Sequence, residues 1–297
     1  CGVSDSDTSI NMNSIEMLKL KKKINNYKIG ILCVYEDSSS THKALNPSVH
    51  WTPAMTDRII ANRNEYANKH GYKVIVGTDA INHDYPVAWS KFVAIEKYMN
   101  DLDYMVYIDL DIVIMNMEIK LEDIILYSIL HGKPDDPFAY KVHSNSNNKV
   151  KPQPMANGMS SMSPPDIIMT NDRNGPNTGV FFIKNTDWSM WLVKESFSWA
   201  KRMSHKTTQD GLKYPFEYEQ RAIHYLLNTD VWSKRGLPTY KEYSNVREHF
   251  NYIPPCKMNV YSVPPFFKET TETRYNNQYI DGDLLIHFAG YKGRTKI

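Results

Sequence analysis

The chain has 297 residues and a formal net charge of +2, with 41% hydrophobic and 23% charged residues. This composition is typical of a folded globular protein and excludes a disordered one. So balanced a charge gives no general reason to expect nucleic acid as the partner. No apolar run reaches the ~18 residues that a bilayer span needs, so we expect no membrane span in this chain.

The chain divides into a tail and one domain. Residues 1–26 begin polar and end in a short basic amphipathic stretch, which predicts a frayed tail with one or two helical turns. From residue 27 the pattern is regular, so we expect a single domain over 27–297. Its nucleotide-binding half would cover 27–116, and its acceptor and sugar half 117–297.

The first half predicts alternating strands and helices. Apolar runs at 28–35, 72–76 and 104–108 are typical of buried strands. Helical spacing of apolar residues indicates helices at 52–70 and 88–99. Strands that alternate with helices in this way predict an α/β fold with a parallel sheet and crossover helices.

The second half is less regular. Residues 131–178 are rich in Pro, Asn and Ser, which indicates either a long binding loop or a disordered segment, interrupted by short strands at 138–142 and 166–169. We expect the acceptor to bind in the 144–165 part of this loop. The other predicted elements are strands at 180–183 and 283–286 and helices at 187–203 and 216–227.

Two carboxylates follow the third predicted strand. Asp109 and Asp111 lie directly after the apolar run 104–108, at the strand end where open α/β sheets bind ligands. Two acids without a local Lys or Arg repel each other unless a cation joins them. Carboxylate oxygens suit Mn²⁺ or Mg²⁺, which also bind phosphate. The pair therefore predicts a divalent cation site.

This Asp-x-Asp pattern occurs in two enzyme classes. In haloacid-dehalogenase-type phosphatases Asp109 would be a nucleophile, whereas in glycosyltransferases both acids would hold a metal against the donor diphosphate. The phosphatase motif normally follows the first strand, and here two strand–helix units precede it. The phosphatase also needs a late Asp pair of a different spacing from that of Asp281 and Asp283. We therefore prefer the glycosyltransferase and keep the phosphatase, or an inactive sugar-nucleotide-binding module, as alternatives.

The end of the chain supports this preference. His287 follows a predicted buried strand and offers an imidazole as a further metal ligand. Gly290 and Gly293 flank Lys292, so the backbone could approach a phosphate whose charge the ammonium would neutralise. We expect His287 at the metal and Gly290 and Lys292 at the diphosphate.

Taken together, five segments of the chain resemble a known family. In chain order they are Trp89-Ser90-Lys91, the string Tyr107–Asn116, the block Gly175–Trp188, Glu219-Gln220, and His287–Gly290. They resemble glycosyltransferase family 34, which comprises the galactosyl/mannosyltransferases of fungi and the xyloglucan xylosyltransferases of plants. The resemblance spans roughly residues 29–293.

The resemblance implies a single-domain α/β fold of the GT-A type, in which a Rossmann-like, nucleotide-sugar-binding mixed sheet is flanked by helices. It also implies a metal-dependent nucleotide-sugar donor and retention of anomeric configuration. It implies that Asp109 and Asp111 bind metal and donor, with His287 as the third protein ligand. The other residues that it places at the donor are Tyr35, Lys91, Asn177, Thr178 and Gly179. The family's helix motif carries adjacent Asp residues before Gln, whereas this chain has Glu217, Glu219 and Gln220 as the candidate catalytic residues.

The sequence thus predicts a glycosyltransferase that moves a hexose or pentose from a nucleotide sugar to a glycan or glycoprotein acceptor. A UDP-sugar is the favoured donor, and GDP-mannose is the alternative. One Asn-x-Ser/Thr motif is present, Asn46-Pro47-Ser48, and its proline disables it. The missing sequons and anchor favour the cytoplasm, whereas family analogy favours the Golgi lumen if an anchor was removed.

Overall fold

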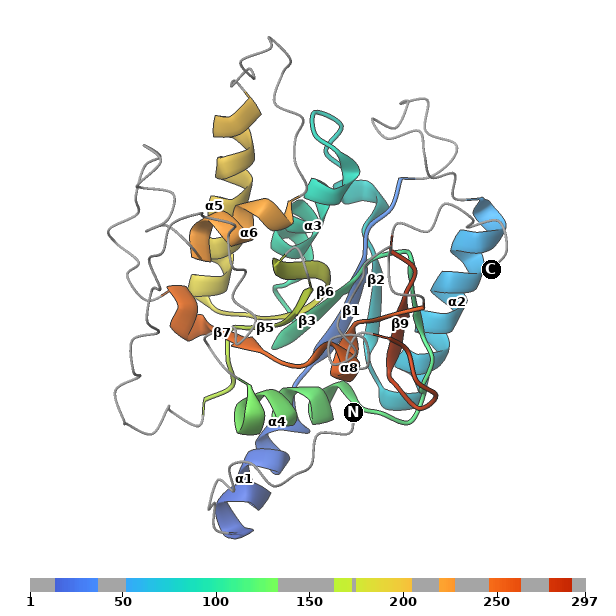
Figure 1. Cartoon of the computed structure of the whole chain (residues 1–297), viewed down its shortest axis with the longest axis vertical. Coiled ribbons are helices and arrows are strands. Elements are labelled where there is room, and N and C mark those ends of the chain that lie inside the picture. Colours follow the sequence, from blue (N-terminus) through green and yellow to red (C-terminus); the bar gives the residue numbers. More distant parts are fainter. Residues whose placement is uncertain are drawn as a thin grey trace, which may run out of the picture.

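The computed structural model describes residues 14–36, 52–132, 163–172, 175–204, 219–227, 246–262 and 278–289. The predicted strand at 138–142 lies outside these residues. Within them, a six-stranded central sheet has the order β2-β1-β3-β6-β5-β7, and a small second sheet has the order β4-β9-β8 (Figure 1). The α/β architecture expected from the sequence is confirmed.

The first half of the domain folds as predicted. The parallel strands are β1 (Ile29–Cys33), β2 (Lys73–Val76) and β3 (Tyr104–Ile108), and the crossover helices are α2 (Pro53–His70) and α3 (Ser90–Tyr98). All residues of β1 and β3 are buried, which explains their continuous apolar sequence.

Helix α2 shows why these boundaries can be read from the sequence. The Thr52 hydroxyl accepts a hydrogen bond from the Met55 N–H, and Pro53 occupies the first turn. At the other end Gly71 adopts φ +79°, and its N–H donates to the Ala67 carbonyl. Both ends are therefore satisfied by local sequence signals.

The second half makes the sheet mixed. Strand β6 (Gly175–Lys184) runs antiparallel to β3, β5 (Ile167–Asp172) antiparallel to β6, and β7 (Phe250–Tyr252) parallel to β5. The small sheet joins β4 (Ile112–Ile114), β8 (Val260–Tyr261) and β9 (Leu285–His287). The remaining α-helices are α1 (Ser14–Ile24), α4 (Leu121–His131), α5 (Asp187–Ser204), α6 (Gln220–Leu227) and α8 (Pro255–Met258).

The helix in the predicted tail is longer than expected. Helix α1 has 11 residues, and its Leu20 and Ile24 are buried against the core next to α4 (Figure 1). Burial of this apolar stripe explains why the helix extends beyond one or two turns. Of the helices that the structure describes, none is long and apolar enough to cross a membrane.

Candidate active site

The Asp pair lies in the turn between β3 and β4. The Asp109 N–H donates to the Gly179 carbonyl at 2.8 Å, which continues the pairing of β3 with β6 for one residue. After Asp111 the chain enters β4, where Ile112 pairs with His287 of β9. Two antiparallel ladders thus bring Gly179 and His287, far apart in sequence, to the Asp pair.

A buried arginine of α2 donates hydrogen bonds to backbone carbonyls of this turn. Arg63 of α2 is fully buried, and its Nη2 donates to the carbonyl oxygens of Asp109 at 2.6 Å and Ile108 at 3.3 Å. Sequence reasoning missed this residue. A signal existed, because Arg63 lies four residues after Ile59 and three before Tyr66, on the stripe that α2 buries.

Lys91 lies next to Asp109 in a buried cluster. Its ammonium is fully buried and donates to Glu219 Oε1 at 2.5 Å, to the Thr178 carbonyl at 3.0 Å and to Asp109 Oδ1 at 3.4 Å. It also lies 4.5 Å from the centre of the Tyr107 ring. The predicted donor-binding residue Lys91 is therefore engaged with protein oxygens.

The electrostatics of this cluster follow from burial and pairing. Burial alone would lower the pKa of Lys91, but the charges of Asp109 and Glu219 outweigh it, so the pKa is raised. Burial raises the pKa of Asp109, Lys91 opposes this shift, and Asp111 and Glu219 add to it. One lysine thus does not neutralise the carboxylates that surround it.

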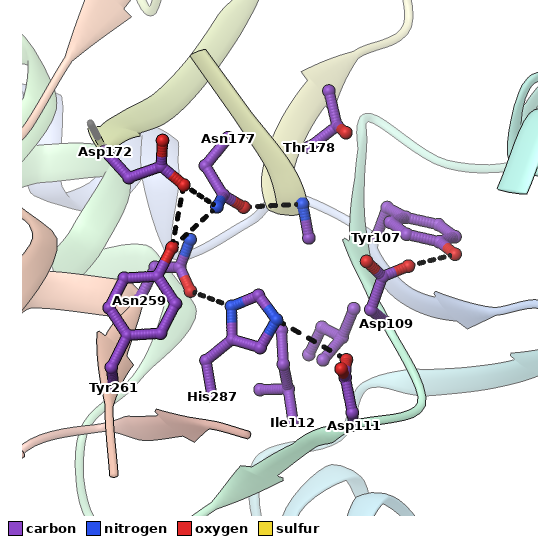
Figure 2. A network of polar contacts seen from close by, with 12 residues as sticks. Tyr107, Asp109, Asp111, Ile112, Asp172, Asn177, Thr178, Asn259, Tyr261 and His287 are labelled. Carbon is purple, nitrogen blue, oxygen red and sulfur yellow. Dashed lines mark hydrogen bonds and ion pairs between the residues drawn. The ribbon is translucent and has the colours of Figure 1, made fainter. Parts of the chain in front are cut away.

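His287 faces the other carboxylate. Its Nε2 lies 3.4 Å from Asp111 Oδ1, and its Nδ1 lies 2.9 Å from Asn259 Oδ1 (Figure 2). The residue is 5% exposed, and its ring stacks on the Tyr261 ring at 5.2 Å between ring centres. The fold therefore places His287 beside Asp111, as predicted for a shared ligand set.

Gly179 lies between these groups. A Cβ atom there would come within 2.8 Å of the His287 ring, 2.9 Å of Asn177 Oδ1 and 3.3 Å of Asp109 Oδ2. No ordinary side chain fits without displacing one of them. The glycine is required by close approach, and its φ is not in the left-handed region.

The neighbouring Asn177 is held inside the protein. Its Oδ1 accepts from the Gly179 N–H at 2.8 Å, and its Nδ2 donates to Asp172 Oδ2 at 2.7 Å and to the Tyr261 oxygen at 3.0 Å. Tyr261 itself donates to Asp172 at 2.8 Å (Figure 2). Sequence reasoning missed Asp172, Asn259 and Tyr261, because no local pattern marks them.

The remaining predicted site residues fall into two groups. Tyr35 is half-buried beyond the end of β1, and Gln220 is the first residue of α6, directly after Glu219. Glu217, Gly290 and Lys292 lie outside the described residues, so their roles stay predictions.

The donor set fits a divalent cation. Within the described residues no group of three or more His, Cys, Asp or Glu side chains is already arranged around a common point. Asp109 and Asp111 nevertheless offer hard oxygen ligands beside an imidazole nitrogen. Burial is the main cause of the raised pKa of Asp109, and a cation at this point would relieve the repulsion from Asp111 that adds to it.

The chain matches known proteins over most of its length. The sequence model of the galactosyl transferase GMA12/MNN10 family matches residues 31–296. An uncharacterized alpha-1,2-galactosyltransferase of Schizosaccharomyces pombe is 24% identical over 93% of the chain, and the probable alpha-1,6-mannosyltransferase MNN10 of Saccharomyces cerevisiae is 23% identical over 78%. The matched parts cover 64% and 54% of these relatives, respectively.

Solved glycosyltransferases are more distant. One involved in glycosylation of the major capsid of PBCV-1 aligns with a TM-score of 0.46 and 13% identity, over 89% of this chain and 93% of its own. The galactosyltransferase LgtC, with donor and acceptor sugar analogs, aligns with a TM-score of 0.41 and 11% identity, over 88% and 87%. With the mixed sheet described above, the family match confirms the expected GT-A fold class.

Proposed function

The chain belongs to the galactosyl transferase GMA12/MNN10 family, and on that premise we propose that it transfers a sugar from a nucleotide sugar to a glycan acceptor. The observation that carries the proposal is the meeting of Asp109, Asp111 and His287 at the end of β3. This family is one of glycosyltransferases, so the phosphatase alternative loses its support.

A divalent cation, with Mn²⁺ preferred and Mg²⁺ possible in its place, would be held by Asp109, Asp111 and His287. When bound, it would supply positive charge to the donor diphosphate as the glycosidic bond breaks. Asp111 and His287 face each other at 3.4 Å, while the fully buried Lys91 balances part of the charge of the half-buried Asp109.

The chain's own residues would orient the donor around this point. We propose that Tyr35 meets the nucleoside, that Gly290 and Lys292 contact the diphosphate, and that the 177–179 segment faces the sugar. Lys91, which is fully buried, would act on the donor through Asp109 and Glu219. Glycosyl transfer passes through an oxocarbenium-like state, which a carboxylate or amide stabilises. Glu217, Glu219 and Gln220 are the candidates, and Glu219 Oε1 already accepts from Lys91 and Thr178.

We favour a UDP-linked hexose or pentose as the donor, with GDP-mannose as the second choice, and transfer with retention. The relatives reported above are named as galactosyl- and mannosyltransferases, which agrees with either nucleotide. Acceptor identity would be set by residues of the 144–165 segment.

A donor screen tests the proposal. The protein is incubated with UDP-galactose, UDP-glucose, UDP-xylose or GDP-mannose, with Mn²⁺ or with EDTA, and released nucleoside diphosphate is measured. We expect one donor to be turned over with Mn²⁺ and not with EDTA. Asp111→Ala should lower this rate by roughly 10²–10³-fold while the Tm stays close to that of the wild type.

Three outcomes would overturn parts of the proposal. Wild-type turnover by Asp111→Ala without metal would remove the cation site. Hydrolysis of p-nitrophenyl phosphate with a covalent phosphate on Asp109 would restore the phosphatase. Donor binding without turnover on any glycan acceptor would leave a sugar-nucleotide-binding module.

Lys292 and His287 have separable roles in this scheme. Lys292→Ala should lower kcat by roughly 10²–10³-fold, because it removes an electrostatic partner of the leaving group. It should weaken nucleoside diphosphate binding and leave binding of the bare nucleoside unchanged. His287→Ala should instead raise the Mn²⁺ concentration needed for activity. Wild-type behaviour of both variants would place the diphosphate elsewhere.

A further inference from the structure

We propose that Asn259 and Tyr261 are positioning residues for His287, which together fix the tautomer and the plane of its imidazole so that Nε2 faces Asp111. The proposal rests on the cation site of the proposed function. It concerns two residues that bind neither donor nor cation themselves.

The backbone brings both residues to the histidine. Strand β8 pairs in parallel with β9, with Tyr261 opposite His287. Asn259 ends helix α8 two residues before Tyr261, and its side-chain oxygen lies 2.9 Å from His287 Nδ1. Figure 2 shows the three side chains converging, with His287 between Asn259 and Asp111.

The amide of Asn259 can select the tautomer. Its Nδ2 donates to Thr170 Oγ1 at 3.2 Å, which turns its oxygen toward His287. That oxygen lies 2.9 Å from Nδ1 and can only accept, so Nδ1 carries the hydrogen. In the neutral ring Nε2 then has the lone pair, which is the form that binds metals.

Tyr261 fixes the plane of the ring. Its ring stacks on the imidazole with 23° between the planes, and its hydroxyl donates to Asp172 Oδ2 at 2.8 Å. Asp172 is held in turn by Asn177. Because Asn259 is 2% and Tyr261 7% exposed, neither side chain has room to rotate away.

The target of this arrangement is the carboxylate of Asp111. The distance of 3.4 Å from Nε2 to Asp111 Oδ1 is longer than the 2.7–3.2 Å of an ordinary N–H···O bond. An Nε2 without hydrogen beside a carboxylate leaves both groups as electron-pair donors. Such a pair is suited to share one cation, and outer contacts of this kind typically change metal affinity 10–100-fold.

The first experiment measures the tautomer without any metal. In ¹⁵N-histidine-labelled protein at a pH where His287 is neutral, NMR should show hydrogen on Nδ1 and none on Nε2. Asn259→Leu keeps the volume and removes the acceptor, so the hydrogen should redistribute to Nε2. Hydrogen on Nε2 in the wild type, or an unchanged tautomer in Asn259→Leu, would overturn the role of Asn259.

The second experiment measures Mn²⁺ affinity directly, by EPR of free Mn²⁺ in the presence of UDP. Asn259→Leu should raise the Kd for Mn²⁺ about 10–100-fold, and saturating Mn²⁺ should restore most of kcat. Tyr261→Phe removes only the hydroxyl and should raise this Kd several-fold. If the Kd for Mn²⁺ rose no more in these two variants than in the control variants, Asn259 and Tyr261 would have only a packing role.

Two control variants remove similar groups away from the site. Asn185→Leu removes a side-chain amide that donates to the carbonyl of Leu102, and Tyr66→Phe removes a hydroxyl that donates to the carbonyl of Ile119. Both should lower the Tm without changing Mn²⁺ affinity. If the wild type itself bound no Mn²⁺, the proposed function would fail, while the NMR experiment would still decide whether Asn259 sets the tautomer.

Discussion

The two carboxylates of the Asp pair lie two residues apart and have opposite surroundings. Asp109 faces Lys91, a cation that the chain itself supplies and buries completely. Asp111 faces His287, behind which lie an amide and a phenol, none of which needs to carry a charge. The first acid is partly compensated by a buried lysine, whereas under the proposed function the second would share a cation with His287.

We infer from this difference that the Lys91–Asp109 pair mainly serves the stability of the fold, and that the Asp111–His287 pair mainly serves cation binding. The fixed pair, Lys91 with Asp109, contains a fully buried ammonium. Its loss should therefore lower the stability of the fold. The second pair, Asp111 with His287, is held by neutral groups, so its loss should mainly lower cation affinity. Three variants test this division, in decreasing order of expected effect.

Lys91→Met should have the largest effect on stability. It leaves the buried Glu219 and the half-buried Asp109 without their cation, and breaking a buried pair in this way typically costs about 3–5 kcal/mol of the free energy of unfolding. Adding Glu219→Gln should recover part of this loss in a chemical denaturation series. Lys97→Met breaks an exposed pair with Asp79 and should change little. Equal losses for both lysines would contradict the division.

Gly179→Ala should affect both pairs, because the new methyl group would push against His287 of one pair and crowd Asp109 of the other. Overpacking of this kind costs about 1–3 kcal/mol, and turnover should fall more than stability suggests. The matched variant Gly71→Ala meets no atom within 4 Å but has φ +79°. It should lose stability alone, so a comparable loss of turnover there would remove the special role of Gly179.

Tyr107→Phe should have the smallest effect. It removes a hydroxyl that donates to Asp109 Oδ1 at 2.7 Å, a bond whose net contribution is about 0.5–1.5 kcal/mol. The ring that covers Lys91 remains, so the fixed pair should persist. Thermal unfolding should show a small drop in Tm, similar to that of Tyr104→Phe, which loses a hydroxyl bond to the Pro165 carbonyl. A loss as large as that of Lys91→Met would mean that Tyr107 holds the cluster.

The sequence predicted the parts of the molecule whose cause is local. Buried strands such as β1 and β3 are continuous apolar runs, and the Asp pair stands out because two charges follow such a run. The mixed sheet was predicted from the family resemblance and not from the strand pattern, because the direction of β6 depends on its pairing with β3 and leaves no local sequence signal.

Some residues of the candidate site have a local sequence signal and others have none. His287 was found because it follows an apolar strand, and its place beside Asp111 follows from the β4–β9 ladder. Asn259 and Tyr261 were missed, because a strand of two residues has no periodicity to read. Arg63 was missed, although the helical spacing of α2 places it on the buried face of that helix.

The pairing of β4 with β9 also has a consequence for the stage of folding at which the site forms. Ile112 and His287 pair directly, although more than half of the chain lies between them. Closing so long a loop costs entropy that no local contact repays, so such pairings tend to form late. Unlike the parallel strands β1 to β3, which can assemble from nearby segments, the cation site would be among the last parts to form. Mn²⁺ binding would then report complete folding. A partly folded molecule in which only the N-terminal half had formed would lack the cation site and would not bind Mn²⁺.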